Sequence, residues 1–252
     1  MLLFYRTLCQ MKSIRFLLLC FVFCTTAGSS QPPEGEPDSE ATRTEMAADR
    51  GKPAVSKAFK PGEWLKFRIH YGILNASYAT LHLTSDTVEG VPVYHVVGKG
   101  KTTGFASLFF KVDDTYESYF GKQDGRPYRF IRKVNEGGYT KDIEIEFDYQ
   151  EQEAVLHDKK VEKIHTFGIR RNLQDLISAF YYLRNNYEAS DLTVGESIEL
   201  DMLYDDDGIF TFRLKYLGRE VLKTKFGKVE CLKFRPYVQS GRVFKEQESL
   251  SL

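Results

Sequence analysis

Apolar and polar residues alternate along most of the chain after residue 63, with the period of two that is typical of strands that place one face on a core. Glycine-containing turns, such as those at Gly90, Gly125 and Gly138, separate these segments. Short alternating segments joined by such turns favour an antiparallel meander. The predicted strands are 64–71, 76–84, 91–98, 116–121, 126–134, 139–149, 154–157, 160–166, 197–204, 209–219, 221–226, 229–236 and 242–252.

One segment has the period of a helix instead. Its apolar residues recur at spacings of three and four: Leu173, Leu176, Ile177, Phe180 and either Tyr181 or Leu183. Asn172 is the expected N-cap, with Asp175 at the third helical position, and the run 184–186 is the expected end. We therefore predict a mainly β fold, in which an antiparallel meander forms a curved sheet or incomplete barrel covered by one α-helix.

The first 57 residues have a different character. A short basic stretch, 11–15, precedes nine apolar residues, 16–24, and a run of small residues follows. Nine helical residues cover about half of a hydrocarbon layer that is roughly 30 Å thick, so this pattern predicts a signal peptide and not a membrane span. We expect residues 1–28 to be that signal peptide, with Met11 the better start. Lipidation at Cys24 is disfavoured, because Phe23 and not a small residue precedes it.

Residues 29–57 are rich in proline and acidic residues and lack aromatic side chains, which predicts a disordered linker. Residues 58–252 then form a single β-rich domain. Its last segment alternates up to Leu252 with no turn or polar tail, so we expect a domain truncated at its C-terminus. From the signal peptide we expect a periplasmic or outer-membrane associated protein, with membrane contact at most peripheral.

Charge and cysteine content exclude some functions. The chain has 35 basic and 35 acidic side chains, and the part after residue 57 has 28 basic and 29 acidic ones, so a nucleic-acid partner is not expected. Removal of the signal peptide leaves Cys231 as the last cysteine and permits no intrachain disulfide. We expect Cys231 to be a small buried apolar residue and not a nucleophile.

The candidate metal and phosphate motifs are weak. His70 and His82 lie on neighbouring predicted strands and would face each other at best as a pair, whereas zinc sites need three or four compact ligands. The acidic segment 205–208 lacks the ligand spacing of a calcium loop and predicts a tight turn. The segment 98–104 matches a phosphate loop in composition alone and predicts a mobile loop. We expect no metal and no cofactor.

The candidate catalytic groups are equally weak. Carboxylates cluster at Asp113 and Asp114, and at Glu144, Glu146 and Asp148, where alternation places them on a solvated face and not across a cleft. No serine lies in a nucleophile motif. The sequence therefore predicts no catalytic residue and a protein that is not an enzyme.

The most apolar short segment of the domain is 105–110. Core burial as a strand is the favoured interpretation, and a membrane-touching lip or a lid over a pocket are the alternatives. The aromatic run 180–182 is likewise expected to be core before ligand contact. If a hydrophobic pocket exists, its candidate ligand-binding residues are Phe105, Leu108, Phe109, Phe110, Phe180 and Tyr181.

Several motifs in order resemble an uncharacterised family of exported proteins of Gram-negative bacteria, the domain of unknown function 3108. They are FKPGEWL at 59–65, YG at 71–72, ASYA at 76–79, VDDTYES at 112–118, the helix at 175–184 and GKVECL at 227–232. The resemblance covers about residues 57–252. It implies an envelope β-protein with a curved or incompletely closed barrel that continues past Leu252, and it supplies no catalytic residues.

Two functions follow as hypotheses. The first is a carrier or scaffold that binds a lipid or another hydrophobic small molecule between the curved sheet, the helix and the 98–110 segment. The second is a structural or assembly partner that pairs its sheet edges with an outer-membrane or surface protein. An enzyme ranks third, because no catalytic motif is present.

Overall fold

The computed structural model describes residues 58–71, 74–104, 106–170, 172–224, 227–237 and 250–251. The predicted signal peptide and linker lie outside these residues. Eight antiparallel strands pair in chain order to form one sheet. They are β1 (Trp64–Tyr71), β2 (Leu74–Val88), β3 (Val91–Thr102), β4 (Asp113–Gly121), β5 (Pro127–Glu136), β6 (Tyr139–Asp148), β7 (Glu153–Asp158) and β8 (Lys163–Gly168).

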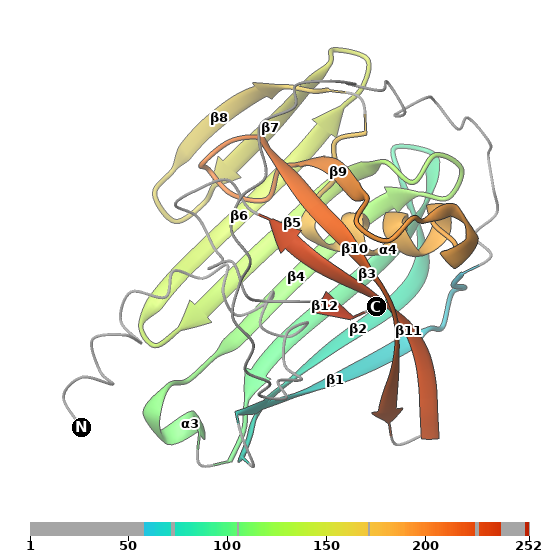
Figure 1. The fold of residues 1–252 in the computed structure, drawn as a ribbon. Helices are drawn as coiled ribbons and strands as arrows, with labels where there is room; N and C mark the ends of the chain where they lie inside the picture. The colour runs from blue at the N-terminus through green and yellow to red at the C-terminus, as the bar shows by residue number, and fades with distance from the viewer. Residues whose placement is uncertain are drawn as a thin grey trace, which may run out of the picture.

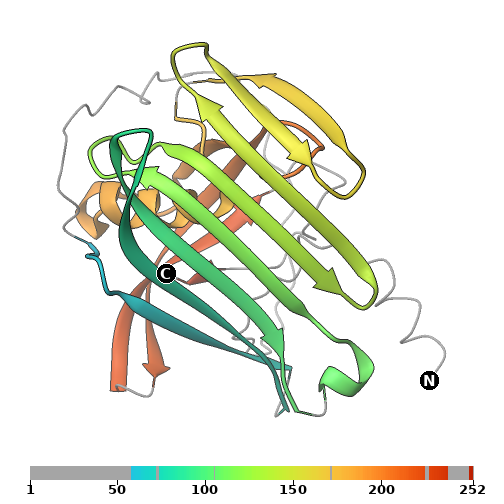
Figure 2. The same ribbon diagram turned by 180° about the vertical axis from the view of Figure 1, so that it is seen from behind.

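The second half of the chain covers one side of this sheet (Figures 1 and 2). A short helix, α3 (Ala106–Phe109), joins β3 to β4. After β8 come α4 (Leu176–Asn186), the 3-10 turn η1 (Ala189–Asp191), β9 (Ser197–Met202), β10 (Phe210–Thr224), β11 (Gly227–Tyr237) and β12 (Leu250–Ser251). These last strands form a second antiparallel sheet in the order β12-β11-β10-β9. Among the described strands no pairing joins β1 to β8, so the predicted mainly β, incompletely closed meander with a covering helix is confirmed.

Three sequence predictions are corrected. The prediction of a mobile loop at 98–104 is wrong, because β3 continues to Thr102 and pairs with both β2 and β4 over that stretch. The prediction of a buried strand at 105–110 is wrong, because α3 occupies the centre of this segment and Leu108 is 77% exposed. The two strands 209–219 and 221–226 form the single strand β10, whose register shifts between Tyr216 and Gly218. Gly218 has φ +110°, a conformation that glycine adopts without strain.

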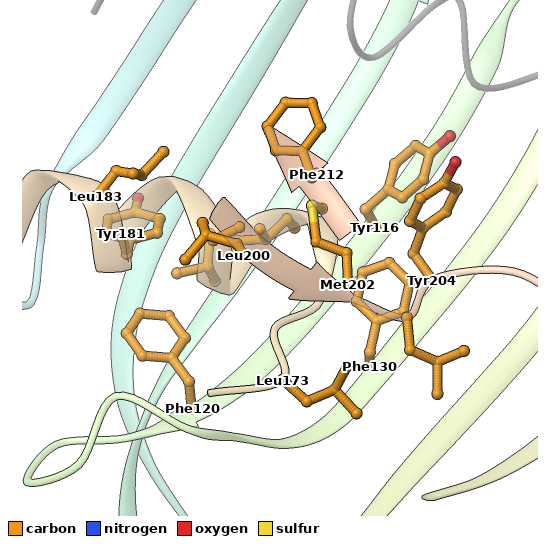
Figure 3. Close-up of a cluster of buried hydrophobic side chains, with 14 of the residues drawn as sticks. Tyr116, Phe120, Phe130, Leu173, Tyr181, Leu183, Leu200, Met202, Tyr204 and Phe212 are labelled. Atoms are coloured by element: carbon orange, nitrogen blue, oxygen red, sulfur yellow. The ribbon is translucent and has the colours of Figure 1, made fainter. Parts of the chain in front are cut away.

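The core lies between the eight-stranded sheet and its cover (Figure 3). Strands β4 and β5 contribute side chains from the sheet, while α4 and the second sheet contribute the facing layer. Labelled members in Figure 3 are Tyr116, Phe120, Phe130, Leu173, Tyr181, Leu183, Leu200, Met202, Tyr204 and Phe212. At Gly98 a Cβ would lie 3.1 Å from Leu81 Cδ2 and 3.4 Å from Ile177 Cδ1. Glycine here therefore lets α4 approach the sheet closely.

Asp175, and not Asn172, is the N-cap of α4. Its Oδ1 accepts hydrogen bonds from the backbone N–H groups of Ile177 and Ser178, both at 2.8 Å, and its Oδ2 accepts one from Ser118 Oγ at 2.6 Å. Ser178 Oγ in turn accepts a bond from the Asp175 N–H, which completes a capping box. Because Ser118 lies on β4, the cap fixes the start of the helix to the sheet. Burial raises the pKa of Asp175 to about 6, although these donors favour the ionised form.

Replacement of Asp175 by asparagine should remove a pH dependence without removing the cap. A carboxyl with a folded pKa near 6 and an ordinary value of 3.8 stabilises the fold fully below pH 4 and loses that contribution as the pH rises through 6. The stability of the wild-type protein relative to D175N should fall by on the order of 3 kcal/mol across this window. Urea unfolding at pH 4.5 and 7.5 captures about 2 kcal/mol of this change, because the rest lies below pH 4.5. Parallel pH profiles for the two proteins would contradict the prediction. D175A should be less stable than D175N at both pH values, because the cap itself is lost.

Candidate functional site

A segment before β1, residues 58–63, closes one end of the core; we call it the strap. Its backbone joins β2 through Gly62, which donates to the Leu83 carbonyl at 2.8 Å, and through Glu63, whose carbonyl accepts from Leu83 N–H at 3.0 Å. Phe59 precedes these bonds and is 8% exposed. The strap therefore places one aromatic ring inside the molecule ahead of its first bond to the sheet.

Phe59 fills an aromatic socket that other elements build. We define the socket as Tyr94 of β3, Phe120 of β4 and Tyr181 of α4. The Phe59 ring centroid lies 5.3 Å from that of Tyr94, 6.2 Å from that of Phe120 and 4.7 Å from that of Tyr181, in edge-to-face arrangements. Such geometry is favourable for aromatic pairs. All three walls come from parts of the chain remote from Phe59 in sequence, so the strap brings its ring to a site that other elements build.

Arg184, near the end of α4, joins the strap to the socket. Its Nη1 and Nη2 donate to the two carboxylate oxygens of Glu63, each at 2.8 Å, and Nη2 also donates to the Ala58 carbonyl at 3.1 Å. The guanidinium lies 5.6 Å from the Phe59 ring centroid and 5.3 Å from that of Tyr181. Burial and the nearby Glu63 carboxylate raise the pKa of the Tyr181 hydroxyl. This end of the domain thus combines three aromatic rings around Phe59 with an arginine that donates through both terminal nitrogens.

A second cluster, of buried charges, lies elsewhere in the core. Arg132 of β5 is 1% exposed, and its Nη1 lies 2.6 Å from Asp205 Oδ2, in the turn that follows β9. Lys141 of β6 lies 3.4 Å from Asp205 Oδ1 and 2.8 Å from Asp206 Oδ1. Burial alone would lower the pKa of Arg132, but Tyr116 and Asp205 raise it above its ordinary value. The ion pairs therefore connect the eight-stranded sheet to the turn from the second sheet.

Two buried carboxyl groups, Asp114 of β4 and Glu136 of β5, lie beside Arg132. Burial and a hydrogen bond with Asp114 raise the pKa of Glu136 to about 9, and burial also raises the pKa of Asp114. Two carboxyl groups hydrogen bond to each other when they hold one proton between them. Paired acids of this kind occur in catalysis. Here, however, Arg132 lies beside both acids and also forms an ion pair with Asp205, so the buried acids have a buried cation of the same cluster as their partner. The cluster therefore serves as a structural link.

The structure does not bring the predicted ligand-binding residues together. Phe180 and Tyr181 lie on α4, whereas Leu108 and Phe110 lie in and after α3, which precedes β4. Tyr181 packs on Phe120 near the far end of β4, roughly 20 Å along the strand at about 3.3 Å per residue. Both views of the ribbon show the two helices apart (Figures 1 and 2). Phe105 and the side chain of Phe109 lie outside the described residues.

Individual positions clarify this separation. Leu108 faces solvent, and the half-buried Phe110 ring covers Gly137, where a Cβ would clash with it. Tyr181 is a core residue, as expected for the aromatic run, and Phe180 is half-buried. The described members of the predicted set therefore do not come together, and the socket at the α4 end is the candidate site.

The other sequence motifs have mixed outcomes. His82 pairs with Trp64 and His70 with Asn75, so the two histidines do not face each other. The 205–208 turn is confirmed by the Gly208 N–H to Asp205 carbonyl bond of 3.4 Å. Cys231 is half-buried and not buried. Within the described residues, no group of three or more His, Cys, Asp or Glu side chains is placed to hold a metal ion, and no helix is long and apolar enough to span a membrane.

The carboxylates are not all on a solvated face. Glu146 and Asp148 are exposed as predicted, but Glu144 is buried and forms ion pairs with Arg129 and Lys159. Asp114 is fully buried, because its even position on β4 shares the core face with Tyr116. Neither Arg132 nor Arg184 stood out in the sequence, because their partners Asp205 and Glu63 are far away along the chain. The clearest sequence signal for the strap was the isolated Phe59 before Pro61 and Gly62.

The Arg132–Asp205 link can be tested with a double-mutant cycle. Arg132→Met should destabilise the domain by about 3–5 kcal/mol, because it leaves Asp205 buried without its partner. Combination with Asp205→Asn should cost less than the sum of the single changes by at least about 1 kcal/mol. Denaturant unfolding at pH 7 gives all four stabilities. The exposed pair Arg213–Glu199 is the matched control, for which the coupling should stay under about 1 kcal/mol. Additive effects of R132M and D205N would disprove the link.

Comparisons with known proteins give a similar solved structure and a matching family model. A crystal structure of a β-barrel-like protein of the domain of unknown function DUF1849, from Brucella abortus, is similar with a TM-score of 0.41 and 11% identity, over 66% of this chain and 72% of that one. A search of curated proteins finds no match. The family model described as protein of unknown function (DUF3108) matches residues 66–252. Because the match spans most of the chain and the whole meander after the start of β1, this protein belongs to the DUF3108 family.

Proposed function

We propose that this domain is a non-enzymatic, exported binding protein that takes an apolar ligand into the aromatic socket when the strap withdraws. One observation carries the proposal: the socket is built by β3, β4 and α4, while the ring that fills it comes from a separate segment. The apolar run at 16–24 supports export, with the periplasm or the outer membrane as the place of action.

The energetics allow such an exchange. Withdrawal of one phenylalanine ring from an apolar site costs about 1.5–3 kcal/mol, which a ligand of similar apolar area recovers. Among the described residues, the strap's backbone hydrogen bonds to β2 begin at Gly62, three residues after Phe59, and β1–β2 pairing begins at Trp64. The rest of the concave face is filled by core side chains, so the proposal concerns one socket and not a large internal cavity.

Removal of the Phe59 ring should expose the socket. Phe59→Ala should bind indole, a neutral apolar probe, at least tenfold more tightly than the wild-type protein, because the internal competitor is gone. Isothermal titration of purified, delipidated protein measures the affinity. Leu108→Ala, which removes an exposed apolar residue from α3, is the matched control and should behave like the wild type. A folded F59A variant that shows no saturable uptake would refute the proposal.

The second hypothesis, an assembly partner that uses sheet edges, draws on the outer part of the β10–β11 hairpin. Strand β9 pairs with β10 only as far as Lys215, and β12 pairs with β11 only at Lys233 and Phe234. Beyond Gly218 the two strands pair only with each other among the described residues, and Val221 and Val229 are 59% and 41% exposed. Two-stranded ribbons are marginal in water, and open edges accept further strands.

This alternative predicts a partner strand from an envelope protein. Val221→Lys combined with Val229→Lys should abolish cross-linking to that protein in the envelope fraction, whereas Val161→Lys combined with Leu108→Lys should leave it intact. Val161 and Leu108 are exposed apolar residues outside the hairpin, so they control for a general loss of surface hydrophobicity. Quantitative mass spectrometry of the cross-linked products gives the comparison. Equal recovery with both double variants would argue against the hairpin as the contact.

A further inference from the structure

The strap presents two chemical groups to one end of the domain, a benzyl ring and a carboxylate. Phe59 places its ring in the socket, and Glu63 places its carboxylate on Arg184. Together they resemble a ligand with an apolar body and an acidic end. We infer that the aromatic socket and Arg184 form a binding site for an apolar carboxylate, and that Phe59 and Glu63 occupy it in the closed state. The inference rests on the proposed function, since it names the ligand class of the same socket.

The geometry at Arg184 specifies a carboxylate. Both terminal nitrogens donate to the two oxygens of one carboxylate, each at 2.8 Å, which is the forked arrangement that a planar guanidinium makes with a planar acid. The side chains of Arg184 and Glu63 are 22% and 17% exposed, so the pair is largely shielded from water. The buried Tyr181 hydroxyl has no hydrogen-bond partner among the described residues, and it lies on the same helix as Arg184.

The charges around the socket favour an acidic ligand over a neutral or basic one. If the strap withdraws, Glu63 leaves Arg184 against the rings of Phe180 and Tyr181, at 5.2 and 5.3 Å from their centroids. A partly buried cation without a counter-ion is costly, so an incoming carboxylate restores a balance that a neutral molecule cannot. Lys122, whose Nζ lies 5.5 Å from the Tyr94 ring centroid, adds positive charge on another side of the socket.

Arg184 contacts the Phe59 ring as well as the Glu63 carboxylate. Arg184 lies 5.6 Å from the Phe59 ring centroid while it holds Glu63, so the acid and the apolar group are held by adjacent parts of one surface. The ligand therefore needs its carboxylate within a few bonds of an aryl or alkyl group. 3-Phenylpropanoate and octanoate both meet this requirement, and they distinguish an aryl from a fatty acyl source.

Because the strap is part of the chain, it competes with a ligand at a high effective concentration. The apparent affinity of the wild-type protein is lowered by the fraction of time that the strap is closed. A Phe59→Ala, Glu63→Gln variant should therefore bind 3-phenylpropanoate at least tenfold more tightly than the wild type does. Glu199→Gln, which breaks an ion pair with Arg213 on the second sheet, is the matched control and should leave the affinity unchanged.

The decisive comparison is between an acid and its matched alcohol in one variant. In F59A/E63Q, isothermal titration should give at least tenfold tighter binding of 3-phenylpropanoate than of 3-phenylpropan-1-ol, and addition of Arg184→Gln should abolish that preference. Equal affinities for acid and alcohol would overturn the carboxylate inference and leave the apolar socket standing. Absence of binding by either compound, and by indole to F59A, would overturn both. The acid–alcohol ratio is measured within one folded protein, so differences in stability between variants do not affect it.

Displacement of the strap has its own readout in the wild-type protein. The N–H groups of Gly62 and Leu83 are protected by the bonds that hold the strap to β2. Saturating octanoate or 3-phenylpropanoate should accelerate hydrogen exchange at these two amides, while amides within β6–β7 pairing stay unchanged. Unchanged exchange at Gly62 and Leu83 with ligand bound would show that the acid binds without moving the strap, and this would overturn the closed-state part of the inference.

Discussion

An open, curved sheet has a concave apolar face that cannot be left in water, and the burial of that face governs the arrangement of the rest of the chain. In this protein, segments that follow the eight-stranded meander in sequence cover its concave face. Helix α4 and the β9–β11 strands lie on one side of the sheet and fill its concave surface (Figure 3). The position of α4 then depends on a small number of local features, chiefly the absent side chain at Gly98 and the Asp175 cap bonded to Ser118.

Polar groups enter the core where the eight-stranded sheet meets the segments that cover it. Apolar packing between a sheet and its cover is non-directional, whereas the Arg132–Asp205 and Lys141–Asp206 ion pairs fix particular atoms to each other. The same logic applies at the other end, where Arg184 and Glu63 determine the position of the strap. At the strap, the ion pair lies beside a ring that a separate segment inserts among the socket residues, and this distinguishes the candidate binding site from the structural link.

Much of the fold follows from sequence patterns, because strand alternation and glycine turns are local. The antiparallel meander and the helix near 176–186 were predicted within a few residues. The failures have a common cause in tertiary context. Segment 98–102 looks like a loop until β2 and β4 pair with it, and the apolar segment 105–110 becomes a short helix at a chain reversal. The site escaped prediction because Phe59, Phe120 and Arg184 are far apart in sequence, and no periodicity links a ring before β1 to a cation at the end of α4.

The extra residue in β10 affects how substitutions along that strand should be interpreted. Before the bulge, the even-numbered residues Phe212, Leu214 and Tyr216 point inward, opposite Pro236 and Phe234 of β11. After it, Arg219 stands opposite Leu232, and Arg219 and Val221 are exposed while Glu220 and Leu222 are half-buried. The even-numbered positions therefore remain the less exposed ones on both sides of Leu217, although the pairing register has shifted. A cross-strand partner worked out from the register of one half of β10 is off by one residue in the other half.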